Sequence, residues 1–157
     1  MNRVDVVAGL IVQEGLLLVC QRKEGGAFPL KWEFPGGKVE SDEGHEDALC
    51  RELMEELGIR ADKLSEIFRH THKYSDAFVV NLRFYRVDSF TGVLRNRAFQ
   101  HVAWAGIDEL STFDFLDGDL PVIDLLQSTS GRELLPLFRG LCWFNRRLRY
   151  PRGVTDA

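Results

Sequence analysis

The chain has 157 residues, of which 45% are hydrophobic and 28% are charged, a balance that suits one globular domain with a sizeable core. Its formal net charge of −4 disfavours a protein that holds nucleic acid by charge alone. No apolar run approaches the roughly 18 residues that a membrane span requires. Residues 1–5 lack a signal-peptide pattern, and the three cysteines form no metal motif, so we expect a cytoplasmic protein without membrane association.

Two strands and a loop open the chain. Residues 4–12 form a continuous apolar run typical of a buried strand, Gln13-Glu14-Gly15 indicates a hairpin turn, and residues 16–21 return as the second strand. A glycine-rich loop follows over residues 23–30. Arg22 precedes this loop, and its side chain is either a solvated cation or a contact to base or phosphate, for which the planar guanidinium is suited.

Residues 32–59 predict a strand, a glycine turn, a polar loop and a helix. Trp32-Glu33-Phe34 has the composition of a strand, and Pro35-Gly36-Gly37 indicates a sharp turn where the backbone can approach a ligand closely. Residues 38–42 are expected to form the loop. The helix is indicated by an apolar residue at every fourth position, and Gly58 suits its C-terminal cap.

Three carboxylates gather on that predicted helix. Glu52, Glu55 and Glu56 stand at i, i+3 and i+4, so they project from one face within about one 5.4 Å turn. Like charges this close repel one another and weaken an isolated helix. A hard cation compensates the repulsion, because Mg²⁺ and Mn²⁺ take carboxylate oxygens, water and substrate phosphates as ligands. The alternative is a surface helix with solvated glutamates.

The spacing around these glutamates resembles the signature of the Nudix hydrolases. Five residues separate Gly37 from Glu43, and seven more separate Glu43 from Arg51. The rest of the signature continues without a gap in register, as Arg51-Glu52-Leu53, Glu55-Glu56 and Gly58-Ile59. Every defining position is filled. The resemblance implies an α/β protein with the Nudix fold, a mixed β-sheet sandwiched between helices.

The resemblance also implies roles for the signature residues. Glu52, Glu55 and Glu56 are expected to bind Mg²⁺, for which Mn²⁺ can substitute, and a backbone carbonyl of Gly36 or Gly37 is expected to add a ligand. Glu52 or Glu55 can also orient the attacking water. Such a cation neutralises phosphoryl oxygens and lowers the pKa of a bound water, so that a phosphoanhydride is hydrolysed.

Arg51 and Glu43 complete the signature. The resemblance implies that they join the loop to the helix through a salt bridge.

The rest of the chain alternates predicted strands and helices. We expect strands at residues 64–72, 78–87, 93–95 and 101–104, a short helix from residue 107, and a second helix whose N-terminal part is residues 120–127. Loops and turns are expected at residues 60–63, 73–77, 88–92 and 114–119. Strands on both sides of the glutamate helix, with another helix after the last strand, predict a mixed sheet between two helical layers. Residues 1–140 are therefore expected to form a single domain.

The residues around the signature resemble the MutT-type members, which are nucleoside triphosphate pyrophosphohydrolases. Phe34 stands where that group lines the base pocket, although it can equally belong to the core. Asp119 stands at the group's base-reading position, where cytidine-nucleotide members also carry Asp. A carboxylate there accepts hydrogen bonds from the exocyclic amine of cytosine, or from the ring N–H and amine of guanine. The alternative is that Asp119 caps the helix that follows it.

Two positions depart from the MutT-type pattern. Those members carry a glutamate six residues before the tryptophan that ends a strand, here Trp104, and this chain has Ala98 instead. Either a glutamate of the helix then acts as the base, or the loop is aligned differently. The second departure lies near Phe78, where the group has an arginine that faces the base. An aromatic ring at this position can stack on a base instead.

Other substrates and other sites stay open as alternatives. Tyr74 stands where ADP-ribose hydrolases carry a proline, slightly before the tyrosine of diadenosine polyphosphate hydrolases. A nucleotide sugar, or a binding module without activity, is a further alternative. His70, His72 and His101 offer no complete metal site and are expected at a strand surface or lining a pocket.

Residues 141–157 form a basic and aromatic extension, which we expect to be packed on the domain, partly flexible, or in a dimer contact. Basic and aromatic interleaving can also bind a single strand, such as the triphosphorylated 5′ end of an RNA.

The sequence as a whole predicts a Mg²⁺-dependent hydrolase that converts a nucleoside triphosphate to the monophosphate and pyrophosphate. Modified, oxidised or cytidine-type deoxynucleotides are the candidate substrates. We expect a monomer or a homodimer with no stable nucleic-acid partner.

Overall fold

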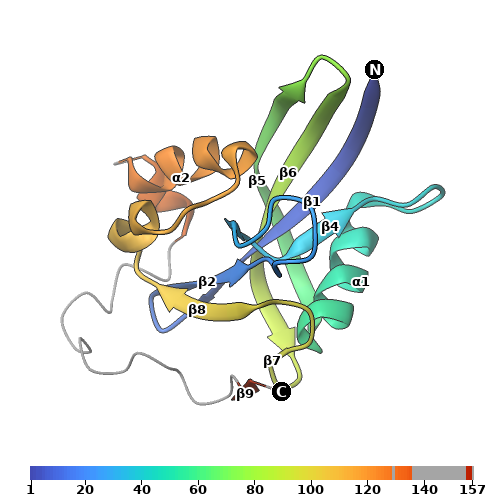
Figure 1. Cartoon of the computed structure of the whole chain (residues 1–157). Helices are drawn as coiled ribbons and strands as arrows, with labels where there is room; N and C mark the ends of the chain where they lie inside the picture. The colour runs from blue at the N-terminus through green and yellow to red at the C-terminus, as the bar shows by residue number, and fades with distance from the viewer. Residues whose placement is uncertain (129, 136–154, 157) are drawn as a thin grey trace.

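Strand β1 (Asn2–Gln13) lies at the centre of a seven-stranded mixed sheet. The computed structural model describes residues 1–128, 130–135 and 155–156 (Figure 1). Strand β2 (Leu16–Gln21) pairs with β1 in antiparallel fashion, and β6 (Phe78–Thr91) runs parallel to β1 on its other side. The predicted hairpin between β1 and β2 is confirmed: Glu14 and Gly15 both have positive φ, as a tight two-residue turn requires.

Four further strands complete this sheet. Strand β3 (Trp32–Glu33) pairs with β2, and β5 (Arg60–Ser75) pairs with β6 as the opposite edge. Strand β4 (Gly36–Lys38) pairs with β1, and β8 (His101–Ala105) pairs with β2. The parallel β1–β6 pair among antiparallel neighbours makes the sheet mixed, as predicted.

Helices cover both faces of the sheet. On one face, Val7 and Ile11 of β1 join a buried cluster with the leucines of α1 (His45–Leu57). On the other face, Leu10 and Val12 join a second cluster with the apolar residues of α2 (Leu120–Gln127). The two clusters follow from the alternation of side chains along a strand. The expected α/β/α arrangement is therefore confirmed (Figure 1).

Helix α1 has the buried apolar face and the C-terminal glycine cap that its sequence predicts. Leu49, Leu53 and Leu57 lie at every fourth position and are fully buried. The helix ends at Gly58, whose φ of 67° is left-handed and whose N–H donates to the Met54 carbonyl at 3.0 Å. The Ile59 N–H returns to the Leu53 carbonyl at 3.4 Å, which completes a Schellman-type cap.

The glycine segment before α1 is a strand and not the predicted turn. Gly36 pairs with Ala8, and Gly37 with Val7, so β4 runs against the central strand. A Cβ on Gly36 would lie 2.0 Å from the Val7 carbonyl oxygen, and its φ is 153°. Only glycine lets the two backbones come this close, so the small residues that indicate a turn serve close strand packing here.

The hairpin of β5 and β6 is longer than predicted at three of its four ends, and β6 begins at the predicted residue, Phe78. Residues 60–63 and 73–75, expected as loop and turn, belong to β5, and residues 88–91 belong to β6. The ladder contains several register shifts, which bulges absorb, and it carries polar side chains on its exposed positions. Polarity at these ends therefore marks solvent-facing strand and not loop.

The remaining elements follow the predicted order. Strand β7 (Arg95–Asn96) lies later than the strand expected at residues 93–95, and a 3-10 helix, η1 (Ile107–Thr112), replaces the short helix. The expected loop at residues 114–119 contains η2 (Asp117–Asp119), and α2 begins where predicted but ends at Gln127, without the continuation that was expected. A further turn, η3 (Gly131–Leu134), follows α2.

The backbone of β9 (Thr155–Asp156) pairs in parallel with β7. Most of the extension at 141–157 lies outside the described residues, so the predictions for the extension and for the domain boundary stay predictions. No helix in the described part of the chain is long and apolar enough to cross a bilayer.

Candidate active site

The glycine strand β4 and helix α1 meet through the glutamates of the signature. The Gly36 N–H donates to Oε2 of Glu56 at 3.1 Å. The Glu52 carboxylate lies against Gly37, since a Cβ there would be 2.4 Å from Glu52 Oε1. The structure therefore brings Glu52, Glu56 and Gly37 together, as the resemblance implies, and Glu55 lies on the same helix with an exposed side chain.

Arg51 holds the preceding loop to the helix. Its Nε and Nη2 donate to the two carboxylate oxygens of Glu43 at 2.8 and 3.0 Å, so the predicted salt bridge is present and bidentate. Its Nη1 donates to Glu52 at 2.8 Å and, at 3.4 Å, to Glu55. The Arg51 hydrogen bond lowers the pKa of Glu43. Arg51 therefore fixes the acidic loop and carries the positive charge nearest to the glutamates.

Glu56 lies in an environment that disfavours its charge. The pKa of Glu56 is raised to about 9, chiefly by burial and also by the nearby carboxylates of Glu33 and Glu52, against the opposing effect of the Gly36 hydrogen bond. Burial also raises the pKa of Glu33, although Arg22 opposes that shift. Several carboxylates thus lie close together, with Arg22 paired to Glu33 and Arg51 paired to Glu52.

Arg22 is paired within the protein and is not the solvated cation that was one of the two alternatives. Its Nη1 donates to Glu33 Oε2 at 2.8 Å and its Nε to the Ala27 carbonyl at 2.8 Å. The side chain therefore ties the glycine-rich loop to β3 in this structure. Its role as a substrate contact stays a prediction.

The residues present fit a divalent cation. Carboxylate oxygens are the ligands that Mg²⁺ prefers, and a dication favours the ionised form of a carboxyl that burial has left neutral. Within residues 1–128 and 130–135, no three carboxylate, imidazole or thiol groups are already gathered into a ready metal site. Arg51 engages Glu52 and Glu55 in the present arrangement. Glu52, Glu55 and Glu56 are the residues that would hold the ion.

Asp119 is buried beside the same carboxylates. It stands at the N-cap position of α2 but makes no side-chain cap hydrogen bond, so the helix-cap alternative is wrong. Only 4% of the residue is exposed, and the Phe34 backbone N–H donates to its carboxylate. Burial raises the pKa of Asp119 well above its usual value, and the charge of Glu33 adds to this effect. Such a buried acid next to a second acid is typical of a binding site.

The two phenylalanines of the predicted base pocket have different places. Phe34 is 3% exposed and packs on Phe115 with ring centroids 5.2 Å apart, so its side chain belongs to the core. Phe78 lies at the start of β6, half-buried, with its ring stacked on Tyr74 at 5.8 Å. The structure thus places Phe78, and not the ring of Phe34, on an accessible aromatic surface.

Two residues of the site were not singled out from the sequence for this role. Glu33 lies between the aromatic residues Trp32 and Phe34. A charged residue in an aromatic strand is unusual, and this could have indicated from the sequence that Glu33 belongs to the site. The Tyr74 hydroxyl accepts a hydrogen bond from the Gly118 N–H at 3.2 Å, beside Asp119. Nothing in the local sequence shows this contact, because 44 positions separate the two residues.

Ala98 stands where the MutT-type pattern has a glutamate, and it lies in the loop after β7. The Ala98 N–H donates to the Asn96 side chain, and the residue packs at the edge of the cluster below α1. Trp104 is buried on β8, and its indole N–H is the one buried side-chain polar atom without a partner among the described residues.

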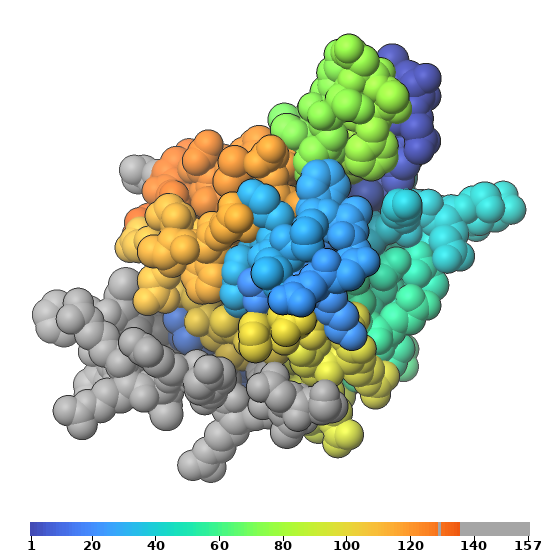
Figure 2. Space-filling model, in the orientation of Figure 1, coloured from blue at the N-terminus to red at the C-terminus, as the bar shows by residue number. Residues whose placement is uncertain are grey.

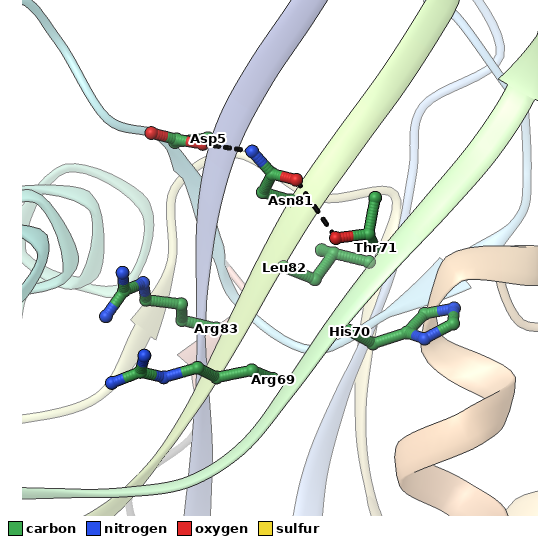
Figure 3. Close-up of a pocket in the computed structure, with 7 residues that line it drawn as sticks. All are labelled: Asp5, Arg69, His70, Thr71, Asn81, Leu82 and Arg83. Carbon is green, nitrogen blue, oxygen red and sulfur yellow. Dashed lines mark hydrogen bonds between the residues drawn. The ribbon is translucent and has the colours of Figure 1, made fainter.

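A separate hollow of about 360 Å³ lies on strands β5 and β6, where they adjoin β1 (Figure 3). Asn81 donates to Asp5 at 2.8 Å and accepts from Thr71 at 3.0 Å. Arg69 and Arg83 both pair with Glu66. The polar and charged side chains that line the hollow are therefore largely paired, and we assign no site to it.

The histidines do not form a metal site. His70 lines this hollow, and its ring lies 5.9 Å from His72, so the expected shared strand face is confirmed.

Comparison with known proteins places this architecture in a family. The model of the NUDIX domain matches residues 1–126. The chain therefore belongs to the Nudix hydrolase family.

Two curated relatives are similar over most of their length. A CTP pyrophosphohydrolase of Escherichia coli K12 is 34% identical over 124 residues, which is 79% of this chain and 91% of the relative. An 8-oxo-dGTP diphosphatase of Haemophilus influenzae is 35% identical over 124 residues, 78% of this chain and 90% of the relative.

Solved structures show the same fold. The E. coli ORF135 protein superimposes with a TM-score of 0.72 at 30% identity, covering 89% of this chain and 95% of that protein. A structure from a study of MutT in Aliivibrio salmonicida and Vibrio cholerae gives a TM-score of 0.67 at 30% identity, covering 78% of this chain and 95% of that protein.

Proposed function

We propose that this Nudix hydrolase converts a nucleoside triphosphate to the nucleoside monophosphate and pyrophosphate, with Mg²⁺ as its ion and Mn²⁺ as a substitute. Relatives named for activity on CTP and on 8-oxo-dGTP support this substrate class. Removal of modified or surplus nucleotides is the role that fits such an activity.

The observation that carries the proposal is the place of Glu33 between two acidic groups. The charge of Glu33 acts on Glu56, which belongs to the glutamate helix, and also on Asp119, which belongs to the α2 side of the sheet. We infer that a site for phosphates and a site for a base adjoin each other at Glu33.

The glutamates of α1 form the part of the proposed site that binds the phosphates. Glu52, Glu55 and Glu56 hold the ion, with the carbonyl of Gly37 as a further ligand. When bound, the ion neutralises charge on the phosphoryl oxygens and lowers the pKa of water. Because position 98 is alanine, Glu52 or Glu55 has to orient the attacking water. Arg51 keeps the acidic loop and helix in register for this task.

Asp119 and Glu33 form the part of the proposed site that binds the base, which we call the base half. Carboxylate oxygens accept hydrogen bonds from an exocyclic amine such as that of cytosine. A carboxyl whose pKa is raised can also keep its proton and donate it to a ring nitrogen or carbonyl oxygen. We therefore propose that the site prefers a base that offers both an amine and an acceptor, with a cytidine-type nucleotide as the first candidate.

A phosphate-release assay over a nucleotide panel tests the proposal. The panel contains standard, oxidised and methylated (deoxy)nucleoside triphosphates, ADP-ribose, a diadenosine polyphosphate and a triphosphorylated RNA oligomer. Each reaction is run with inorganic pyrophosphatase or with alkaline phosphatase. We expect a signal that requires pyrophosphatase on one or two triphosphates. A signal that requires alkaline phosphatase, on ADP-ribose or the dinucleotide, would overturn the substrate class and leave the ion site in place.

We also propose that the enzyme works in the reducing cytoplasm as a monomer or homodimer without a stable nucleic-acid partner. Cys20 and Cys50 are both free thiols, which agrees with that compartment.

A further inference from the structure

The loop between β2 and β3 carries an unusual backbone. Phe28 and Leu30 both have positive φ, 53° and 62°, although neither is glycine. Each such residue is strained and persists only where its surroundings hold it. Here the Ala27 carbonyl accepts from Arg22 at 2.8 Å, and the Leu30 carbonyl accepts from Gln21 at 3.1 Å. Strain that is held in this way is found at ligand clamps.

The strained loop presents an aromatic ring to the base half of the site. Phe28 is 39% exposed, and its ring centroid lies 4.9 Å from that of Tyr74, tilted by 42°. Tyr74 in turn stacks on Phe78 at 5.8 Å. In the space-filling view the loop is the blue segment at the front, between the teal α1 side and the orange α2 side (Figure 2).

Tyr74 connects these rings to Asp119. Its hydroxyl accepts from the Gly118 N–H at 3.2 Å. A Cβ on Gly118 would lie 2.9 Å from that hydroxyl and 2.8 Å from the Leu82 side chain, so the glycine lets the tyrosine lie against this segment without displacement. The next residue, Asp119, points its buried carboxylate toward the Phe34 N–H. The position of Tyr74 is thus fixed by the segment that also positions the acid.

We propose that Phe28 and Tyr74 form an aromatic clamp that takes the base of the nucleotide between their rings. Tyr74 is the fixed wall, because Gly118, Phe78 and His72 hold it. Phe28 is the movable wall, because its side chain is exposed and it lies in a loop outside the sheet. A flat base needs about 7 Å between the two rings, at the upper end of the usual centroid range. The loop therefore opens by roughly 2 Å from the present separation of 4.9 Å when a base enters.

The clamp rests on the proposed function and extends it. Stacking in the clamp adds affinity for any base, whereas Asp119 selects among bases. Stacking of one base on an aromatic ring corresponds to about a five- to hundred-fold gain in binding. Phe28→Ala and Tyr74→Ala should therefore raise KM for the best triphosphate by that factor and leave kcat within about three-fold. Leu30→Ala is the matched control, because Leu30 is equally exposed in the same loop but makes no ring contact.

A second measurement separates the clamp from the reaction. Calorimetric titration of the metal-free protein with a nucleoside monophosphate and with ribose 5-phosphate measures the contribution of the base without turnover. The wild-type protein should bind the monophosphate more tightly, and Phe28→Ala should reduce that preference at least about five-fold. Tyr74→Phe, which keeps the ring, should retain it if Tyr74→Ala fails to fold.

The results distinguish the two proposals. Triphosphate hydrolysis with unchanged KM in Phe28→Ala and in a folded Tyr74→Ala, together with an unchanged preference for the monophosphate in Phe28→Ala, would overturn the clamp alone. Absence of triphosphate hydrolysis with a base preference that depends on Phe28 would overturn the proposed function and support the clamp. A wild-type protein that binds both ligands equally would overturn the clamp whatever its activity.

Discussion

At the scale of single residues, the site consists of acids whose surroundings oppose their charge. Glu56 and Asp119 are both disfavoured as anions by burial, and Glu33 adds its charge to both. A folded protein keeps such groups together when a ligand compensates them, and an ion on one side and a base on the other are the two compensating groups proposed here. Arg51, with bonds to three glutamates, holds the arrangement between turnovers.

Replacement of the glutamates tests their role. Glu55→Gln and Glu56→Gln should each lower kcat by at least about a hundred-fold, the usual effect of removing a group that acts on the transition state. Glutamine at position 56 keeps an oxygen for the Gly36 N–H, so the fold should be retained. Glu46→Gln, on the exposed face of the same helix, is the control. Wild-type turnover in both site variants would refute the assignment.

The buried acid Asp119 predicts a pH dependence of stability. Its pKa is raised in the folded state, so between the unfolded and the folded pKa the native protein binds more protons than the unfolded chain. The contribution of Asp119 is therefore fully present at acid pH and is lost as pH rises through the folded pKa. Asp119→Asn removes this loss, so its stability relative to wild type should increase from pH 5 to pH 8. Urea unfolding at both pH values measures it, and a pH-independent difference would argue against a buried, protonated acid.

Base selection by Asp119 is a separate prediction. Asp119→Ala should change the ratio of kcat/KM between bases by about ten-fold or more, the value of one good polar contact to a base edge. Turnover on the preferred base should change less, since Asp119 does not contact the reacting phosphates in this account. The nucleotide panel measures both quantities. Equal losses on every base would reduce Asp119 to a structural residue.

At the scale of elements, the glycine strand β4 brings the backbone against β1 on one side and the Glu52 carboxylate on the other. A side chain is excluded at its two glycines by different neighbours. A Cβ on Gly36 would meet the Val7 backbone, whereas a Cβ on Gly37 would meet the end of the Glu52 side chain. Backbone cannot move aside without breaking the sheet, and a side chain can.

The two alanine variants should therefore separate stability from activity. Gly36→Ala should destabilise the fold by about 2–4 kcal/mol, in the range of strongly destabilising substitutions. Gly37→Ala should cost below about 1 kcal/mol but lower kcat by about a hundred-fold, because it displaces Glu52. Chemical unfolding and steady-state kinetics of both variants provide the test, and equal effects on both quantities would contradict it.

The elements also show where sequence reasoning succeeds and fails. Helix α1 with its Gly58 cap, α2 and the first hairpin were predicted because their patterns are local: apolar spacing, a cap glycine, a turn between two apolar runs. The ends of β5 and β6 were missed because the local composition does not show which residues pair, over separations from 3 positions (Ser75 with Phe78 at the tip) to 31 positions (Arg60 with Thr91 at the base). The glutamates were found from their spacing. The contacts of Glu33 and Tyr74 were not, since they depend on how distant elements pack.

At the scale of the whole molecule, the two helical layers place the ion side and the base side of the site on different elements of one sheet. Helix α1 brings the glutamates, and the segment before α2 brings Asp119, while β3 carries Glu33 between them. The loop at residues 22–31 covers this junction. A single nucleotide, with phosphates at one end and a base at the other, is the ligand proposed for this arrangement.

Ion binding should appear as a change in global stability. Mg²⁺ at about a hundred times its Kd adds about 2.7 kcal/mol to the stability of the folded state, which is about 5–10 °C in Tm for a domain of this size. Glu56→Gln should lose at least half of that shift, and Glu46→Gln should keep it. Thermal unfolding with Mg²⁺ or EDTA gives the comparison. An equal shift in the two variants would place the ion elsewhere.

The most direct test of the central claim is phosphorus NMR of the products. The wild-type protein is incubated with Mg²⁺ and the preferred triphosphate, and the spectrum is recorded during turnover. The account predicts the resonances of nucleoside monophosphate and pyrophosphate growing together, with no orthophosphate and no reaction in EDTA. Nucleoside diphosphate with orthophosphate, or the same products in the Glu55→Gln and Glu56→Gln variants at wild-type rates, would contradict it.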